Sequence, residues 1–584
     1  MLARGYYCPH VAARRRSVAL RCEGVDSESP TIIVTPSPSL TRTAQLARLG
    51  QRRFDVLVIG GGITGAGIAR DAARRGLDVA LVERDDFASG TSSRSSRLVH
   101  GGVRYLEYGH LRLVFESCHE RRVLLRIAPH LVRPLAFTWP VYEGARIPRW
   151  KLRAGLLLYD LLALFRNVAP HRGLTAEGIA HEEPMLACEG LRGGARYFDA
   201  ATDDARLTLA TMLDAAVSGA TVLNHAEVTA LREADGRVCG VTVRDRLGGR
   251  TLDINASCVV NATGPWTDVV RRMEDPAAPP AILGSKGVHI AVPASRVGNR
   301  GAVTLLASDG RVMFVLPAGL CTIIGTTETE THEAPDHVRA ARADVDYLIA
   351  SANRAFPAAA LTSDDVIAAW AGIRPLAAKA HAGDASSASR EHLIETGRSG
   401  VITVTGGKLT TFRVIARDVV DAAFRALGRQ LPRGGTDRIP LAGGDVRDLE
   451  AEMAAARAAP APTTLRRGSS TRTAARGIKF GRASRTILRL RIASSAVSPM
   501  SRPRSRTPWT PSLPARSPTC SSVAYTSPSR RATMASRWRR GLRRSWRRDW
   551  AGPTVASRRR SPNMPRSWIR PSLSHPKWRG PPFI

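Results

Sequence analysis

The chain has 584 residues, 43% of them hydrophobic, which is long enough for two or more domains with hydrophobic cores and typical of a globular protein. Its formal net charge of +36 is unevenly distributed, because residues 466–584 hold 29 Lys and Arg side chains and one acidic residue, Asp549. The longest apolar run, Ala154–Phe165, has 12 residues, which excludes a membrane span of roughly 20 residues and leaves only peripheral membrane contact.

The eight cysteines contain no CxxC pair and no Cys/His cluster at zinc spacing. This scatter argues for a reducing compartment and against a structural metal. We therefore expect no metal site.

Residues 1–52 begin "MLARGYYCPHVAARRR" and contain no acidic residue before Glu23. The composition is similar to that of a transit peptide, but a misplaced start codon or a disordered extension gives the same pattern. We predict a disordered N-terminal extension that is not part of the catalytic core.

A strand, a helix and a second strand are predicted from residue 54. Phe54–Ile59 is a short β-branched run typical of a buried parallel strand, and Ile63–Arg75 has helical periodicity and ends at Gly76. A second strand, Val79–Val82, leads to Glu83. The order predicts a βαβ unit.

Gly60, Gly62 and Gly65 have GxGxxG spacing at the turn between the first strand and the helix. Such glycines permit a tight turn, the approach of a pyrophosphate and close packing of helix on strand, although a lone GxGxxG also occurs in ordinary βαβ turns. The helix N-terminus then faces the phosphates, and Glu83 is positioned to accept the ribose hydroxyls. An acid there favours FAD or NAD over NADP.

The next segment, "TSSRSSRLVHGGVRYLE", is a Ser/Gly-rich loop where a nicotinamide dehydrogenase usually continues its βα alternation. Further motifs follow in order: "DDARL" at 203–207, "VVNATGPW" at 259–266, "KGVHIAVP" at 286–293, "IIGTTE" at 323–328, "AGIRPL" at 371–376 and "GGKLTTFR" at 406–413. Together with the glycine motif they resemble the FAD-dependent glycerol-3-phosphate dehydrogenases, members of the amino-acid-oxidase-like flavoproteins. The resemblance covers about residues 54–445. It implies an α/β fold over residues 53–445, with a Rossmann-like FAD-binding domain interleaved with a substrate domain built on a mainly antiparallel β-sheet.

The cofactor that the resemblance implies is FAD. "NATG" ends a β-branched run with small residues, and "GGKLTTFR" precedes a helical pattern whose N-terminus can stabilise negative charge on a reduced flavin. Besides Gly60, Gly62, Gly65 and Glu83, the expected cofactor-binding residues are Thr91, Ser92, Ser93, Ala262, Gly264, Gly407, Lys408, Leu409 and Thr410.

The substrate that the resemblance implies is glycerol 3-phosphate. A phosphomonoester favours planar, permanently charged donors, and the resemblance assigns this role to Arg104 and Arg374, two arginines that we expect in loops punctuated by Gly or Pro. His289 is the expected base for the 2-hydroxyl, although a histidine in a strand is also often structural. The further expected substrate-binding residues are Tyr105, Lys286 and Arg390.

The implied reaction is oxidation of sn-glycerol 3-phosphate to dihydroxyacetone phosphate, with hydride transfer from C2 to flavin N5 and electrons passed to a quinone or another acceptor. A cytoplasmic enzyme on the inner face of the cell membrane, and a homodimer, are compatible with the resemblance.

In the IIGTTE segment Glu328 stands where the family pattern has Asp, which lengthens that side chain by one methylene. The alternatives are an amino-acid or sarcosine-type oxidase and a catalytically impaired relative with a basic nucleic-acid-binding tail.

The C-terminal part departs from the family pattern. Residues 446–465 are interpreted as the remnant start of a helical C-terminal domain, and residues 466–584 contain 27 Arg against 2 Lys, with frequent Ser and Pro. A phosphate-binding arm is one interpretation of this segment. The excess of Arg, Pro, Ser and Trp is more typical of GC-rich coding DNA translated out of frame, so we predict an unstructured tail and no nucleic-acid partner.

Overall fold

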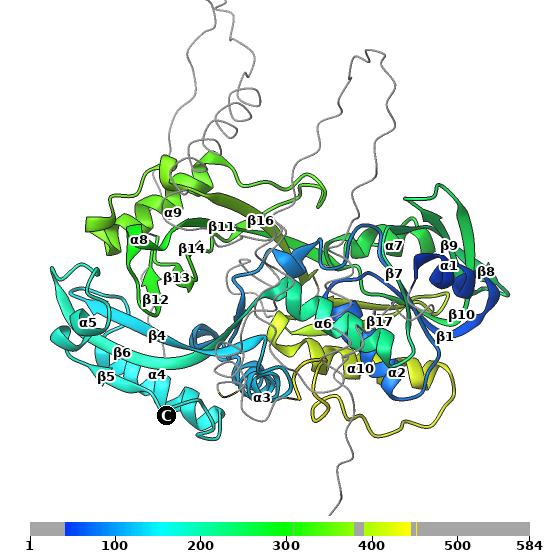
Figure 1. The fold of residues 1–584 in the computed structure, drawn as a ribbon, viewed down its shortest axis with the longest axis horizontal. Coiled ribbons are helices and arrows are strands. Elements are labelled where there is room, and N and C mark those ends of the chain that lie inside the picture. The colour runs from blue at the N-terminus through cyan, green and yellow to red at the C-terminus, as the bar shows by residue number, and fades with distance from the viewer. Residues whose placement is uncertain (1–40, 308, 379–390, 446–450, 452–584) are drawn as a thin grey trace, which may run out of the picture. The chain divides into compact units, whose positions relative to one another are not determined.

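The computed structural model describes residues 41–307, 309–378, 391–445 and 451. Strands in this part of the chain form two sheets, one of eight strands and one of ten (Figure 1). The expectations for residues 1–40, Arg390 and 466–584 lie outside the described residues, as do those for 446–465 apart from Ala451.

The first sheet contains the predicted βαβ unit. Its main path runs β17-β18-β10-β1-β2-β7, in which β1, β2, β7, β10 and β18 pair in parallel and β17 pairs antiparallel. Its strands are β1 (Arg53–Ile59), β2 (Val79–Val82), β7 (Thr221–Leu223), β8 (Ala226–Ala234), β9 (Arg237–Asp245), β10 (Thr251–Asn261), β17 (His392–Thr396) and β18 (Ile402–Gly406). The Rossmann-like arrangement expected from the sequence is confirmed.

Three helices cover one face of this sheet: α2 (Ile63–Arg74), α6 (Asp204–Val217) and α10 (Phe412–Ala426) (Figure 1). Their apolar side chains form one buried cluster with those of β1, β2, β10 and β18. Val58, Val260 and Val419 are among its fully buried members. Burial on both faces explains why these strands are continuous apolar runs in the sequence.

The second sheet is mainly antiparallel, as expected; the parallel exception among its described pairs is β4 with β12. Its strands are β3 (Leu98–Val99), β4 (Val132–Tyr142), β5 (Arg172–Leu174), β6 (Leu191–Thr202), β11 (Ile282–Pro293), β12 (Ala302–Leu306), β13 (Val312–Ala318), β14 (Cys321–Gly325), β15 (Thr329–Glu330) and β16 (Ala368–Ala377). The other described α-helices are α1 (Arg42–Gln51), α3 (Leu111–Ile127), α4 (Arg149–Leu162), α5 (Ala176–Glu182), α7 (Thr267–Glu274), α8 (Ala294–Val297) and α9 (Arg342–Ala355). In the ranges given above, no helix has both the length and the hydropathy needed to cross a bilayer.

The boundary predicted at residue 52 is wrong, because α1 lies within the expected extension. Thr41 caps this helix by accepting a hydrogen bond from the amide of Ala44. Leu49 is fully buried among side chains of the first sheet, and Gln45 accepts a hydrogen bond from the amide of Val222. The helix therefore packs as part of the first domain. It was not predicted, because it has few apolar residues and lies in an arginine-rich N-terminal region.

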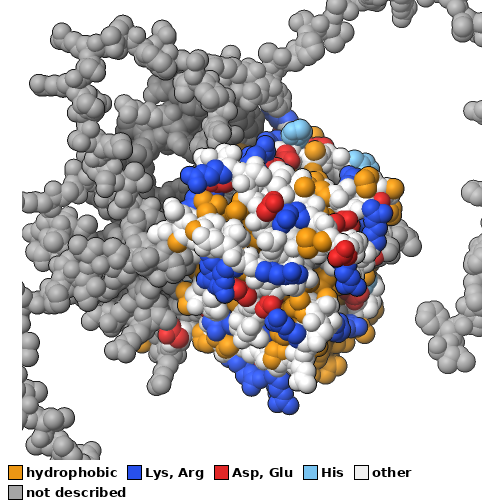
Figure 2. All heavy atoms as spheres, turned by 90° about the vertical axis from the view of Figure 1, so that its right-hand side faces the viewer, with side chains coloured by type: hydrophobic (Ala, Val, Ile, Leu, Met, Phe, Trp, Pro, Cys, Tyr) orange, Lys and Arg blue, Asp and Glu red, His pale blue; other side chains and the backbone are white. Residues whose placement is uncertain are grey.

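Charges of both signs are spread over the face of the first domain that Figure 2 presents, with acidic side chains between the basic ones. Many of the basic side chains in this domain are paired, as in Arg244 with Glu227 and Arg232 with Asp253. This face therefore lacks the single-sign patch that nucleic-acid binding favours.

Candidate active site

Residues 60–62, here called the glycine loop, connect β1 to α2 and bring both into close contact with the end of β10. Gly60 has a φ of +111°, and a Cβ atom there would lie 2.6 Å from the carbonyl oxygen of Ala262. A Cβ atom at Gly65 would lie 1.9 Å from the carbonyl oxygen of Gly60, so only glycine allows the helix to pack on the turn. The amide of Ile63 in the first turn of α2 donates to Ser92 Oγ at 2.9 Å.

Glu83 ends β2 beside this loop. Its carboxylate accepts hydrogen bonds from the amides of Gly61 at 2.6 Å and Asp85 at 2.8 Å. Burial raises the pKa of Glu83, and the two amides oppose that rise. The acid thus holds the glycine loop, and its contact with ribose hydroxyls stays a prediction.

Residues from both sheets line a cavity of ≈ 410 Å³. Most of the residues predicted from the sequence are found in its wall: Gly60, Gly62, Glu83, Thr91, Ser92, Arg104, Tyr105, Ala262, Gly264, His289, Arg374, Gly407, Lys408, Leu409 and Thr410. Residues at the ends of strands of the first sheet, such as Gly60 and Glu83, therefore meet residues of the second sheet, such as His289 and Arg374, at this cavity.

The backbone around the cavity fits a bound FAD. Gly406 and Gly407 have φ values of +72° and +86°, and a Cβ atom at Gly406 would lie 2.4 Å from the carbonyl oxygen of Glu391. They lead into a short 3-10 helix, η8 (Leu409–Thr411), and then into α10. Helix N-termini of α2 and of η8 and α10 thus meet at one cavity, which suits a dinucleotide that carries phosphates and an electron-accepting ring.

Lys408 supplies a cation at this turn. Its Nζ donates to the carbonyl oxygen of His100 at 2.8 Å and lies 5.3 Å from the centre of the Tyr105 ring. Burial lowers the pKa of Lys408, while Tyr105 and the carboxylate of Asp199 oppose the fall. Tyr105 and Asp199 therefore offset part of the cost of burying this ammonium group.

His289 lies on β11 and is 2% exposed. Its ring stacks on Trp370 with a centroid distance of 5.4 Å, and Nε2 forms a 2.8 Å hydrogen bond with Ser96 Oγ. Burial, with Arg374 and Arg97 contributing, lowers the pKa of His289 to about 3. The imidazole is therefore neutral at physiological pH and can accept a proton, while a pKa this far below that pH makes it a weak base.

The two arginines approach the cavity from different elements. Arg104 lies in the 3-10 helix η3 (Val103–Tyr108), and its Nη1 is 3.4 Å from Glu328 Oε2. Arg374 lies in the strand β16 and not in a loop as predicted, because the Gly and Pro around it are accommodated by pairing with β11. Its Nη2 donates to Thr326 Oγ1 at 2.8 Å.

Among the described residues, three that were predicted for the site are not found in the cavity wall. Lys286 is an odd number of positions from His289 in β11, so it faces the other side of the sheet, where Nζ pairs with Asp344 Oδ2 of α9 at 3.0 Å. Its predicted role in substrate binding is therefore wrong. Gly65 packs α2 on the turn, and Ser93, in the 3-10 helix η2 (Thr91–Ser93), donates to the carbonyl oxygen of Gly90 at 3.3 Å.

Ser96 and Asp199 also line the cavity, although neither was predicted from the sequence. Ser96 belongs to the same Ser/Gly-rich loop as Thr91, and that composition was the available signal for it. Asp199 lies on β6, accepts a hydrogen bond from the amide of Gly101 at 3.1 Å and forms a buried ion pair with Arg121. No sequence pattern links Asp199 to Gly101. Within the described ranges no cluster of side chains is suited to bind a metal ion.

Known proteins resemble this chain over the same region. Residues 55–413 match the model of the FAD dependent oxidoreductase family. Glycerol-3-phosphate dehydrogenase 2 of Mycobacterium tuberculosis is 42% identical over 409 residues, 69% of this chain and 68% of that protein. The mitochondrial glycerol-3-phosphate dehydrogenase of Mesocricetus auratus is 40% identical over 442 residues, which cover 72% of this chain and 59% of that protein. The crystal structure of glycerol-3-phosphate dehydrogenase from Bacillus halodurans complexed with FAD is similar with a TM-score of 0.57 and 37% identity, over 69% of this chain and 70% of that one.

Proposed function

The chain belongs to the FAD-dependent oxidoreductases and, among them, to the glycerol-3-phosphate dehydrogenases, and we propose that it oxidises sn-glycerol 3-phosphate to dihydroxyacetone phosphate. One observation carries the proposal: Arg104, Arg374 and a neutral His289 line the same cavity as the residues that fit FAD. The cavity thus combines charge for a phosphate with a base for an alcohol.

The arginines bind the phosphate group. A guanidinium offers planar, paired donors to phosphate oxygens, and each charge-assisted hydrogen bond contributes about 1.5 to 3 kcal/mol. Arg374 is oriented by Thr326 and by Ser285, whose Oγ is 3.4 Å from Nη1. Tyr105 lies beside Arg104, with the guanidinium carbon 5.7 Å from the ring centre.

His289 accepts the proton of the 2-hydroxyl. Its Nε2 forms a 2.8 Å hydrogen bond with Ser96 Oγ, and both residues line the cavity. Stacking on Trp370 holds the plane of the ring. Bound FAD supplies the acceptor for the hydride from C2.

The experiment compares Arg374→Ala and Arg104→Ala with Lys286→Ala as a control that also removes one positive charge. Dye reduction is measured with glycerol 3-phosphate and with glycerol. We expect both arginine variants to raise KM for glycerol 3-phosphate at least tenfold, about 1.4 kcal/mol, with little change for glycerol, and the control to retain the wild-type KM. Equal losses on both substrates, or faster oxidation of sarcosine than of glycerol 3-phosphate, would contradict the proposal.

We further propose that the protein binds peripherally to a membrane and passes electrons to a quinone there. The support is α4 and the residues after it, where Trp150, Leu157 and Phe165 are 72%, 56% and 62% exposed. Leu161 and Leu164 are exposed on the same segment. The exposed basic side chains around this apolar surface are Arg149, Lys151, Arg153 and Arg166. An apolar surface bordered by cations suits an anionic bilayer surface.

Sedimentation with vesicles tests this membrane surface. We expect the wild-type protein to bind vesicles that contain phosphatidylglycerol and to bind pure phosphatidylcholine weakly. Replacing Trp150, Leu157 and Phe165 together by Ser should abolish binding while dye reduction in solution is unchanged. Leu247→Ser, at a 65% exposed leucine on the first domain, is the control. Unchanged vesicle binding by the triple variant would exclude this surface. The homodimer stays a prediction.

A further inference from the structure

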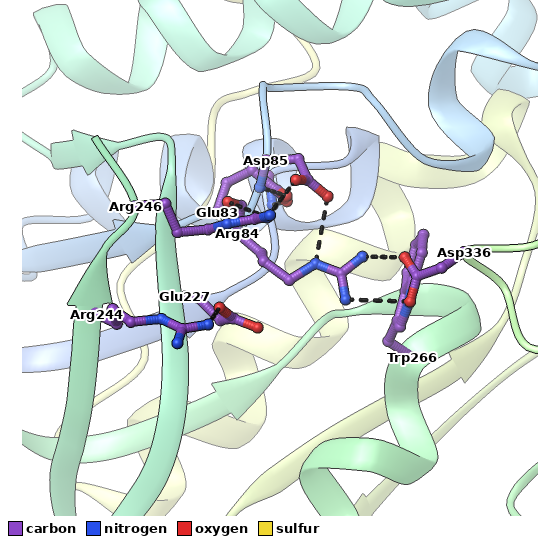
Figure 3. A network of polar contacts seen from close by, with 9 residues as sticks. Glu83, Arg84, Asp85, Glu227, Arg244, Arg246, Trp266 and Asp336 are labelled. Carbon is purple, nitrogen blue, oxygen red and sulfur yellow. Dashed lines mark hydrogen bonds and ion pairs between the residues drawn. The ribbon is translucent and has the colours of Figure 1, made fainter. Parts of the chain in front are cut away.

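Arg84 directly follows Glu83, and its guanidinium is held by two carboxylates (Figure 3). Nη1 lies 3.4 Å from Asp336 Oδ2, Nη2 pairs with Asp336 Oδ1, and Nε lies 3.2 Å from Asp85 Oδ2. The contact between Arg84 and Asp336 is therefore bidentate, the geometry in which arginine binds carboxylates most strongly.

Trp266 completes this group from a third segment, the 3-10 helix η4 (Gly264–Trp266) after β10. Its indole Nε1–H donates to Asp336 Oδ2 at 3.2 Å, and the Arg84 guanidinium carbon lies 4.9 Å from the ring centre. Gly90 leaves room for the ring, because a Cβ atom there would lie 3.1 Å from it. Trp266 thus contacts both members of the ion pair.

The three side chains join separate parts of the fold. Arg84 and Trp266 follow strands of the first sheet, whereas Asp336 lies in the segment between β15 and α9, next to the second sheet. That segment is fixed internally, because Arg339 Nη1 donates to the carbonyl oxygens of Asp336 at 3.1 Å and Val338 at 2.9 Å, and Val338 is buried. Asp336 is thus attached to an ordered segment.

Arg84 and Trp266 also line the cavity, beside Glu83. In a dinucleotide fold the acid at this position marks the ribose, so the Arg84 contact lies at the ribose and adenine end of the site. We propose that Arg84, Asp336 and Trp266 form a clasp that closes this end and sets the rate at which FAD leaves. The inference rests on the FAD site and does not depend on which substrate is oxidised.

The size and salt dependence of the clasp's effect on FAD release follow from the exposure of its charged side chains. The Arg84 and Asp336 side chains are 29% and 49% exposed, so their attraction is screened by salt. The contact with an aromatic ring and the paired hydrogen bonds add to it. We expect loss of the clasp to accelerate FAD release about five- to tenfold at low ionic strength, and less at high ionic strength.

The test measures FAD release from the holoenzyme as the rise in flavin fluorescence after dilution, at low and at high salt. Asp336→Asn removes the charge, and Trp266→Phe keeps a ring but removes the N–H donor. Asp346→Asn is the matched control, because Asp346 forms an exposed ion pair with Arg342 within α9. Thermal unfolding of the FAD-free proteins monitors folding.

We expect both clasp variants to release FAD faster than wild type, the control to match wild type, and salt to accelerate release from wild type but not from Asp336→Asn. Release from Asp336→Asn at the wild-type rate would overturn the clasp. Glycerol 3-phosphate oxidation is measured on the same wild-type preparation. An inactive wild type with the expected release rates would refute the proposed function and leave the clasp standing.

Discussion

Gly325 on β14 lies opposite His289 on β11, and a methyl group there is predicted to displace this proposed base. A Cβ atom at Gly325 would lie 2.3 Å from Cδ2 and 2.8 Å from Cγ of His289, whereas ordinary van der Waals contact begins at 3.4 Å. The imidazole must therefore move by about 1 Å, and a displacement of this size costs about 100-fold in rate. We expect Gly325→Ala to lower kcat by about that factor.

The assay is steady-state dye reduction with glycerol 3-phosphate, together with the flavin content of the purified protein. Flavin content should not change, because the methyl group contacts His289 and not the glycine loop. Gly155→Ala is the control, since a Cβ atom at Gly155 in α4 meets nothing within 4 Å. It should behave as wild type.

A double-mutant cycle tests the cause. His289→Ala removes the ring that the new methyl group would strike, so adding Gly325→Ala to it should cost less than about twofold. If Gly325→Ala costs as much in the His289→Ala background as in wild type, the loss does not act through His289. Wild-type kcat in Gly325→Ala would refute the geometric reasoning directly.

Three further predictions concern pH, charge and the glycine loop. The pKa of His289 is lowered from 6.5 to about 3, so the unfolded chain binds more protons between these values and stability falls as pH drops below 6.5. At pH 5 the wild-type free energy of unfolding should have lost about 2 kcal/mol relative to His289→Asn, measured by urea unfolding. Lys286→Ala should lower stability by about 1 to 3 kcal/mol, because it removes the cation that pairs with the carboxylate of Asp344, while KM for glycerol 3-phosphate stays constant; a raised KM would show that Lys286 does contribute to substrate binding. Gly65→Ala should yield protein without bound FAD, because the methyl group would strike the backbone of Gly60; a full flavin content in its absorbance spectrum would contradict this.

Local features of the sequence predicted the first domain closely. The expected strand Phe54–Ile59 is observed as Arg53–Ile59, and the expected helix Ile63–Arg75 is observed as Ile63–Arg74. Both depend on short-range periodicity and on glycines at fixed spacing, which act within a few residues. The short helix α1 was missed, because its stabilisation comes from contacts such as that between Gln45 and Val222, 177 residues apart.

The second sheet creates contacts that local patterns do not encode. Ser96 and His289 are 193 residues apart and form one hydrogen bond, and Arg104 and Glu328 are 224 residues apart. Ser96 and Arg104 flank β3, which pairs with β6, whereas His289 lies on β11 and Glu328 follows β14 in the same sheet. Strand pairing over such separations depends on the whole fold. The family resemblance supplied His289 and Arg374, but not the partners that orient them.

One error was avoidable from elementary geometry. Side chains alternate between the two faces of a strand, so Lys286 and His289, three positions apart in "KGVHI", cannot both face one cavity while the strand is regular. In the structure His289 lines the cavity, whereas Lys286 pairs with Asp344 on the other face of the sheet. Once the family resemblance suggested His289 as the base, strand alternation already placed Lys286 on the opposite face of the sheet. A positive charge on the cavity face of β11 would moreover stand near the base, where Arg374 already lowers the pKa of His289. The ion pair with Asp344 keeps Lys286, the cation of this motif, away from His289.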